Sequence, residues 1–569
     1  MEFLYLMLSL LLLALLAASA PAKVVLPARG WNAWLAFDVH LNESNVLSNA
    51  HGLVSTGLAA AGYTLVALDG GWQGGRHPNG TVYENSTAFP SGLLALSRSC
   101  QALGLSFGAY TDRGPETCDG HVGSGGHETQ DADFYASIEA SYLKEDSCFS
   151  TQSHSGALAQ FKLMQDALAA TGRAFTFSLC GWLSWYAGEA SLANIGNSWR
   201  VGPDALNWPN VLMNMDAAAG AAPFVAPGKF VDVDEVMGPS RGRPINPTRT
   251  LTQLAFIATV GSPLLLSFDL TARAPTDADV APFLNPELLA VHWDEAPGGP
   301  SFARVAGGAL APDRIPALTR MPCDSPAALW AWAPAPPPAA PATGTLAAAG
   351  APGMCLMAGA AWSGECNNAQ AVWLGACGNA SGGGPNCCTT PSLPGQACTN
   401  QHWTVNASSS TLASAYWPGN NNAAGPYLTL GPTTPGGLFL EERQSTPRQS
   451  WAWEPASGGN SSSSSTGTLR DSEGTCVGAA PRDTTNVWAR RLLGGDVALL
   501  FINNGLTAAG VACSAQCCQQ AGLALGVSLS VRDLLARTDN GTAVCSSSSP
   551  LLFSVPGGGA AVFVRLHHQ

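Results

Sequence analysis

The chain has 569 residues, of which 46% are hydrophobic and only 11% are charged. This composition is incompatible with a disordered acidic chain and predicts a globular protein of several domains. The formal net charge of −13 argues against nucleic acid and anionic membranes as partners.

The chain begins with a continuous apolar run that ends in the small residues Ala18-Ser19-Ala20. This pattern predicts a secretory signal peptide over residues 1–20, with an uncleaved anchor as the alternative because Glu2 is the only early charge. The 16 cysteines and several Asn-x-Ser/Thr sites agree with export and glycosylation. We therefore expect a secreted, vacuolar or lysosomal protein that does not stay membrane-bound after signal cleavage.

Residues 24–298 alternate between short apolar runs, such as YTLVALD and GLSFGAY, and helix-like stretches, such as GALAQFKLMQDALAATG. Alternation of strands and helices predicts a parallel sheet covered by helices. The length of this region is that of a (β/α)8 TIM barrel. A doubly wound sheet is the weaker interpretation, since no glycine-rich phosphate motif follows the first predicted strand.

Residues 299–481 are rich in Ala, Pro, Gly and Ser, and 12 of the 16 cysteines follow residue 320. The motifs LWAW, QHW and QSWAW in this insertion resemble the repeated QxW signature of ricin-type β-trefoil lectins. A lectin-like trefoil and a disulfide-linked β insertion without sugar binding both fit these motifs. Residues 482–569 return to alternating apolar positions, which predicts a C-terminal antiparallel β-sandwich.

Polar residues follow several of the predicted barrel strands, where a barrel enzyme carries its active site. They include Asp69, Tyr110, Lys144, Asp146 and Asp204. Two carboxylates, one as nucleophile and one as proton donor, are what retaining glycoside hydrolysis requires. Carboxylates after strands also cap helices and form structural salt bridges, so spacing alone leaves both interpretations open.

Longer motifs resemble glycoside hydrolase family 27 of clan D, which contains α-galactosidases and α-N-acetylgalactosaminidases. The resemblance covers 27–298 and the terminal sandwich, but not the region between them. The matching motifs are RGWNAW, AAAGYTLVALDGGW, LGLSFGAYTDRGPETC, GGHETQDADFYASIEASYLKEDSC, FSLCGW, GNSWR, DVD, GSPLLLSFDL and NPELLAVHWDEAPG.

The resemblance implies that Asp146 is the nucleophile and Asp204 the acid/base of a double displacement that retains configuration at the anomeric carbon. It also implies a disulfide between Cys118 and Cys148, and it implies neither a metal nor another cofactor. The expected partner is a carbohydrate with terminal galactose or a related sugar. The residues implied to bind this sugar are Trp34, Asp69, Tyr110, Lys144, Trp182, Arg200 and Asp234.

Two glycines depart from the family pattern, and both concern specificity. Gly70 replaces the second of two aspartates that precede Cys-Trp in the family, so one carboxylate for the sugar is missing, which makes β-L-arabinopyranosidase an alternative. Gly181 replaces a glutamate that reads the position-two hydroxyl, and with the small Ser184 it makes α-N-acetylgalactosaminidase a further alternative. A carbohydrate-binding protein with weak catalysis is the competing class of function.

Overall fold

The computed structural model describes residues 26–568, apart from 152, 183, 240–244, 295–300, 309, 311–316, 335–342, 359–371, 378–400, 407–409, 415–426, 431–437, 442–448, 457–465 and 481–482. The predicted signal peptide lies outside the described residues. Among the helices within them, none is long and apolar enough to cross a membrane.

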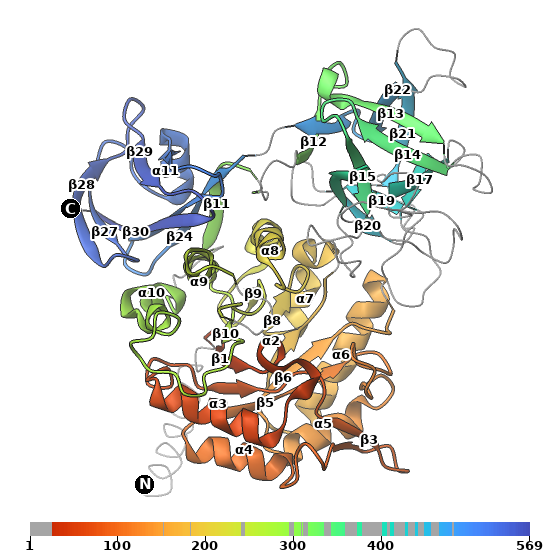
Figure 1. The fold of residues 1–569 in the computed structure, drawn as a ribbon, viewed down its shortest axis with the longest axis vertical. Helices are drawn as coiled ribbons and strands as arrows, with labels where there is room; N and C mark the ends of the chain where they lie inside the picture. Colours follow the sequence, from red (N-terminus) through yellow and green to blue (C-terminus); the bar gives the residue numbers. More distant parts are fainter. Residues whose placement is uncertain are drawn as a thin grey trace, which may run out of the picture.

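Eight parallel strands form the N-terminal sheet, in the order β10-β1-β2-β5-β6-β7-β8-β9 (Figure 1). The two ends of this order meet at a parallel bridge between Val236, just after β9, and Leu266 in β10. The predicted TIM-like barrel is therefore confirmed. The strands are β1 (Arg29–Asn32), β2 (Leu65–Ala67), β5 (Ser106–Asp112), β6 (Tyr142–Asp146), β7 (Thr176–Leu179), β8 (Ser198–Arg200), β9 (Phe230–Asp232) and β10 (Leu264–Leu266).

Helices lie between these strands along the chain, and their apolar faces cover the sheet. In the longest, α6, the buried residues Ala157, Phe161, Met164 and Leu168 recur at helical spacing, and the Ser153 side chain caps the first turn. The helices are α2 (Trp34–Phe37), α3 (Glu43–Ser55), α4 (Leu93–Ala102), α5 (Glu128–Ser137), α6 (His154–Ala170), α7 (Ala190–Ile195), α8 (Trp208–Ala221), α9 (Pro247–Val260) and α10 (Pro286–His292). A small hairpin of β3 (Gln73–Arg76) and β4 (Val82–Glu84) follows β2.

The C-terminal region is an antiparallel sandwich, as predicted. Its six-stranded sheet has the order β11-β24-β25-β30-β27-β28, and β26 pairs with β29 in the second sheet. Helix α11 and the disulfides Cys513–Cys517 and Cys518–Cys545 complete the core between the sheets. The elements are β11 (Phe302–Ala306), β24 (Thr485–Arg491), β25 (Val497–Asn503), β26 (Ala509–Cys513), α11 (Ala515–Ala521), β27 (Ser528–Asp533), β28 (Thr538–Val544), β29 (Leu551–Val555) and β30 (Ala560–His568).

Strand β11 belongs to this sandwich although it precedes the insertion in sequence. It pairs antiparallel with β24, from Phe302 opposite Arg490 to Ala306 opposite Val487. The first strand of the sandwich thus comes from the segment 299–481, which the sequence assigns to the insertion. The chain leaves the sandwich after β11, forms the insertion, and returns to the sandwich at β24, the strand that pairs with β11.

The described residues of the insertion form twelve strands joined in one antiparallel network, separate from the barrel in Figure 1. Three buried tryptophans share its core, and the indole N–H groups of Trp330, Trp403 and Trp451 each donate to a backbone carbonyl of the insertion. Disulfides join Cys323 to Cys476 and Cys355 to Cys377. The lectin-like trefoil and the β insertion without sugar binding both stay open interpretations. The strands are β12 (Ala317–Met321), β13 (Leu329–Pro334), β14 (Thr343–Ala348), β15 (Met354–Ala358), β16 (Val372–Ala376), β17 (His402–Asn406), β18 (Thr411–Ser414), β19 (Tyr427–Leu430), β20 (Leu438–Glu441), β21 (Trp451–Pro455), β22 (Thr466–Asp471) and β23 (Cys476–Ala480).

Barrel and sandwich share a continuous apolar core that includes Trp488 from β24. Polar contacts fix the same interface. The buried Arg490 guanidinium donates to the carbonyls of Thr259 and Asp294, and the Trp208 indole donates to Asn504. The sandwich is therefore part of the structure that supports the barrel.

Candidate active site

One pocket at the carboxyl ends of the barrel strands contains all nine residues that the sequence assigns to catalysis or sugar binding. Its lining comes from several strand ends and from the loops that follow them, as expected for a parallel barrel. The lining residues are Trp34, Leu35, Asp69, Gly70, Tyr110, Cys118, Asp119, Lys144, Asp146, Cys148, Trp182, Arg200, Pro203, Asp204, Leu206, Asp234 and Glu235.

A buried ammonium group joins two carboxylates on one side of the pocket. Lys144 Nζ lies 2.7 Å from Asp69 Oδ2 and 3.7 Å from Glu235 Oε1. Burial lowers the pKa of Lys144, but Asp69 and Glu235 outweigh it and raise this pKa well above its usual value. Asn32 also donates to Asp69 Oδ2, so the Asp69 carboxylate has a fixed orientation.

Asp146 is the last residue of β6, and it is held by two donors. Its backbone neighbour Ser147 donates its N–H to Oδ1 at 2.9 Å, and the Tyr110 hydroxyl donates to Oδ2 at 3.3 Å. Only 6% of Asp146 is exposed, yet the residue lines the pocket. Such a carboxylate has little water around it and a defined direction of approach to a bound sugar.

Asp204 follows β8 and is more open to solvent than Asp146. Arg200 Nη2 lies 2.7 Å from Asp204 Oδ1, and the Asp204 side chain is 44% exposed. Arg200 Nη1 lies 3.6 Å from Asp234 Oδ1, while Asp234 Oδ2 accepts the backbone N–H of Ala205 at 2.6 Å. Arg200 and Asp234 therefore position the loop that carries Asp204.

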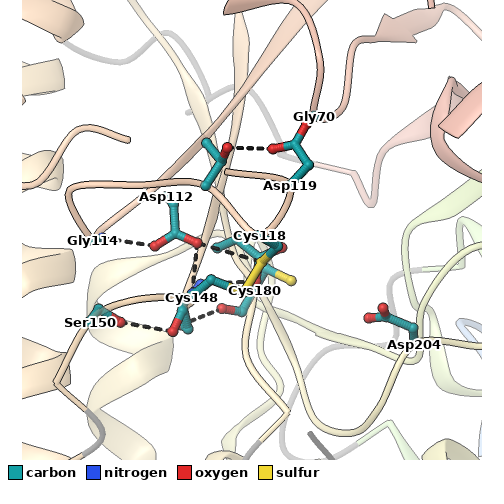
Figure 2. Close-up of a disulfide and its surroundings, with 12 residues drawn as sticks. Gly70, Asp112, Gly114, Cys118, Asp119, Cys148, Ser150, Cys180 and Asp204 are labelled. Carbon is teal, nitrogen blue, oxygen red and sulfur yellow. Dashed lines mark hydrogen bonds between the residues drawn. A yellow bond between two sulfur atoms is a disulfide. The ribbon is translucent and has the colours of Figure 1, made fainter. Parts of the chain in front are cut away.

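A disulfide joins Cys118 to Cys148, the pair that the resemblance implies, and ties the loop after β5 to the loop after β6 (Figure 2). The carboxylate of Asp112 accepts the backbone N–H groups of Gly114 and Cys148, both at 2.7 Å. Burial, followed by the nearby charge of Asp146, raises the pKa of Asp112 well above its usual value. This network fixes the backbone on both sides of Asp146.

Two sequence models match the chain: one described as Alpha galactosidase A over 27–294, and one described as the Alpha galactosidase C-terminal beta sandwich domain over 482–564. A probable α-galactosidase of Dictyostelium discoideum is 37% identical over 273 residues, which is 47% of this chain and 68% of that protein. The chain belongs to the α-galactosidase family of glycoside hydrolases.

A second relative agrees with this assignment, and solved structures share the fold. Alpha-galactosidase 3 of Arabidopsis thaliana is 32% identical over 54% of this chain and 71% of its own length. The crystal structure of α-galactosidase I from Mortierella vinacea has a TM-score of 0.57 at 18% identity, with 96% of this chain and 98% of that chain covered. A β-L-arabinopyranosidase from Geobacillus stearothermophilus has a TM-score of 0.56 at 13% identity and similar coverage, 96% and 97%, so this fold accommodates related enzymes.

Two pocket carboxylates were missed by sequence reasoning. Asp119 lies in the turn after Cys118, and Glu235 lies between β9 and the bridge at Val236. Neither residue directly ends a predicted strand, which was the signal for Asp69, Tyr110, Lys144, Asp146 and Asp204. A search for carboxylates next to the family motifs could have found both, because Asp119 follows ETC and Glu235 follows DVD.

The space beside Gly181 is filled by an aromatic ring. A Cβ atom at Gly181 would lie 2.2 Å from Cζ of Tyr186, whose hydroxyl lies 3.1 Å from the Ser147 hydroxyl. The side chain of Ser184 lies outside the described residues. Cys180 is buried and free, as is Cys100.

Proposed function

We propose that the chain is a retaining glycosidase that releases terminal α-D-galactosyl residues from oligosaccharides or glycoconjugates. The observation that carries this proposal is the presence of Asp146 and Asp204 in one pocket of a family member, in two different environments. Asp146 is buried and held by Tyr110, whereas Asp204 is partly open to solvent. These environments suit a nucleophile and a proton donor that later meets water.

In the first step, a lone pair of the Asp146 carboxylate attacks the anomeric carbon and the bond to the leaving oxygen breaks. Protonated Asp204 donates its proton to that oxygen. Arg200 occupies only one Asp204 oxygen, Oδ1, so the other is available for this proton. In the second step, Asp204 removes a proton from water, the hydroxide attacks the anomeric carbon, and Asp146 is released. Two inversions give net retention.

Sugar binding is supported by groups of complementary chemistry around these carboxylates. Trp34 and Trp182 line the pocket and offer apolar faces to a pyranose ring. Asp69 and Lys144 form a fixed acceptor and donor pair for hydroxyl groups. The expected partner is a carbohydrate, and no step of this mechanism needs a metal or a cofactor. We also expect export through the secretory pathway, in agreement with the disulfides.

The absence of a side chain at Gly70 keeps β-L-arabinopyranosides as a second candidate substrate, because these sugars lack the hydroxymethyl group of galactose. The packing of Tyr186 against Gly181 argues against extra room there for a 2-acetamido group. We therefore place α-N-acetylgalactosaminides behind the other two substrates.

A direct test is an assay of purified protein, at mildly acidic pH, on nitrophenyl α-D-galactopyranoside, β-L-arabinopyranoside and α-N-acetylgalactosaminide. We expect the galactoside to be cleaved fastest, and we expect Asp146→Asn to lower kcat by about a thousandfold or more because the covalent step is lost. Folded protein that cleaves none of the three would contradict the proposal and favour a carbohydrate-binding protein.

A further inference from the structure

The carboxylate of Asp119 occupies the space directly beside Gly70 in the sugar pocket (Figure 2). We propose that Asp119 is a specificity-determining residue, which accepts a hydrogen bond from a hydroxyl group of the terminal sugar on the side of the pocket formed by Asp69 and Gly70. This inference rests on the proposed glycosidase function and names a group that selects its substrate.

A side chain at position 70 would require the Asp119 carboxylate to shift. A Cβ atom at Gly70 would lie 2.9 Å from Asp119 Oδ2 and 3.2 Å from its Cγ, closer than ordinary van der Waals contact. Only glycine at position 70 leaves the Asp119 carboxylate where it stands. The missing side chain of one loop is thus matched by a carboxylate from another loop.

The Asp119 carboxylate is fixed in place by its own loop. The Thr117 hydroxyl donates to Oδ1, and His121 Nδ1 lies 2.9 Å from Oδ2. The same residues close the turn, because the Thr117 N–H donates to the His121 carbonyl at 2.8 Å. The adjacent Cys118 is joined to Cys148, two residues after the nucleophile. The side chain of Asp119 is 6% exposed and lines the pocket.

A fixed and buried carboxylate in a sugar pocket has a specific use. It offers about four acceptor positions, and Thr117 and His121 account for two of them. A sugar hydroxyl that enters the pocket can donate to a remaining position. A sugar without that hydroxyl would leave the carboxylate buried without its partner, and sites of this kind discriminate strongly.

The first test compares kcat/KM of wild type and Asp119→Ala on nitrophenyl α-D-galactopyranoside, α-D-fucopyranoside, which lacks the 6-hydroxyl, and β-L-arabinopyranoside, which lacks the hydroxymethyl group. We expect Asp119→Ala to lower kcat/KM on the galactoside by about ten- to a hundredfold, the effect of losing a hydrogen bond to a charged group. Asp133→Ala, at an exposed position on α5, is the matched control. A change of less than about twofold on all three substrates in folded Asp119→Ala would overturn the proposal.

The pattern across substrates identifies the hydroxyl. A loss confined to the galactoside assigns the hydrogen bond to the hydroxymethyl group, and an equal loss on all three assigns it to a ring hydroxyl; both results support the role of Asp119. The double variant Gly70→Asp/Asp119→Ala should be more active than either single variant, because the carboxylate returns from the other side and the steric conflict is removed. If the loss of activity in the double variant equals the product of the losses in the two single variants, a carboxylate at position 70 does not replace the one at position 119, and this result would contradict the proposal.

Failure of the glycosidase proposal would give a different result. If the wild type binds galactose in calorimetry without hydrolysing any glycoside, the proposed function fails, but Asp119→Ala should still weaken binding by about tenfold or more. Equal binding by wild type and Asp119→Ala would overturn the inference independently of catalysis.

Discussion

At the level of single residues, two carboxylates of the pocket have different surroundings. Asp146 is buried and receives hydrogen bonds from Tyr110 and Ser147, whereas Asp204 is partly exposed and contacts Arg200. The same side-chain chemistry can therefore perform nucleophilic attack in one place and proton transfer in the other.

This division of roles predicts how Asp204→Ala will behave. A glycoside with a poor leaving group needs the proton from Asp204, whereas dinitrophenolate leaves without protonation. We expect Asp204→Ala to lower the rate of glycosylation by about a hundred- to ten-thousandfold on a disaccharide, and much less on a dinitrophenyl galactoside. Pre-steady-state kinetics on both substrates measures the difference. Equal losses on the two substrates would contradict the acid role.

The residues at strand ends could be predicted from strand periodicity, but the loop residues Asp119 and Glu235 could not. Asp69, Lys144 and Asp146 each follow or end an apolar run, so the parallel topology alone brings them to one end of the barrel. The position of Asp119 depends on a turn within a long loop and on a disulfide, and neither has a periodic signal. The match between Asp119 and Gly70 is visible only in three dimensions.

At the scale of secondary structure, β6 shows how strand alternation distributes charge. Lys144 and Asp146 line the pocket, while Glu145 between them points to the other face of the sheet. Glu145 is fully buried, and neither of its carboxylate oxygens has a hydrogen-bond partner among the described residues. Burial, with a smaller contribution from Asp112, raises the pKa of Glu145 well above its usual value, so burial favours the neutral form of this side chain.

A raised pKa in the folded state makes stability depend on pH. At a pH between the pKa of Glu145 in the unfolded chain and its higher pKa in the folded protein, the native state holds a proton on Glu145 that the unfolded state has released. Glu145 therefore stabilises the fold fully below a pH of about 4 and loses this contribution as pH rises through its higher folded pKa. We expect Glu145→Gln, a neutral side chain of the same shape, to remove this dependence, so that its melting temperature falls less than that of the wild type between mildly acidic and neutral pH.

Thermal unfolding across that pH range measures the effect. Glu116→Gln, at an exposed position near the same end of the barrel, is the control and should follow the wild-type profile. Parallel profiles for wild type and Glu145→Gln would show that Glu145 does not titrate differently on unfolding.

At the scale of the whole molecule, the barrel and sandwich form one structural unit, and the insertion is a separate one. The barrel and β24 share a core through Trp488, whereas the insertion has its own core around Trp330, Trp403 and Trp451. The sequence predicted these three regions because their composition and periodicity differ. The sequence could not place β11 in the sandwich, because this short strand is assigned to the sandwich only by its pairing with β24, which is far away in the sequence.

This arrangement predicts that the insertion can be removed. The backbone N–H of Gly308 lies 2.6 Å from Asp483 Oδ2, so the ends of the insertion are adjacent. Among the described residues, none that lines the pocket comes from the segment between them. We expect a variant in which an Asn-Gly turn replaces 309–482 to fold, since β11 and β24 become an ordinary hairpin, and to keep kcat/KM on a nitrophenyl galactoside within about threefold.

Circular dichroism and the same galactoside assay test the deletion. A folded variant with more than about a tenfold loss of kcat/KM would show that the insertion contributes to the pocket. Unchanged cleavage of the small substrate, together with weaker binding to a polysaccharide, would favour the lectin-like interpretation of the insertion over a β insertion without sugar binding.

The central claim is that Asp146 attacks the sugar and forms a covalent intermediate. Its most direct test is mass spectrometry of protein treated with a fluorinated galactosyl fluoride. This reagent forms the glycosyl-enzyme quickly, and the glycosyl-enzyme then hydrolyses slowly. We predict one added fluorogalactosyl group, located by peptide mapping on Asp146 and absent from Asp146→Asn. A label on another residue, or rapid hydrolysis of α-galactosides by Asp146→Asn, would contradict the account.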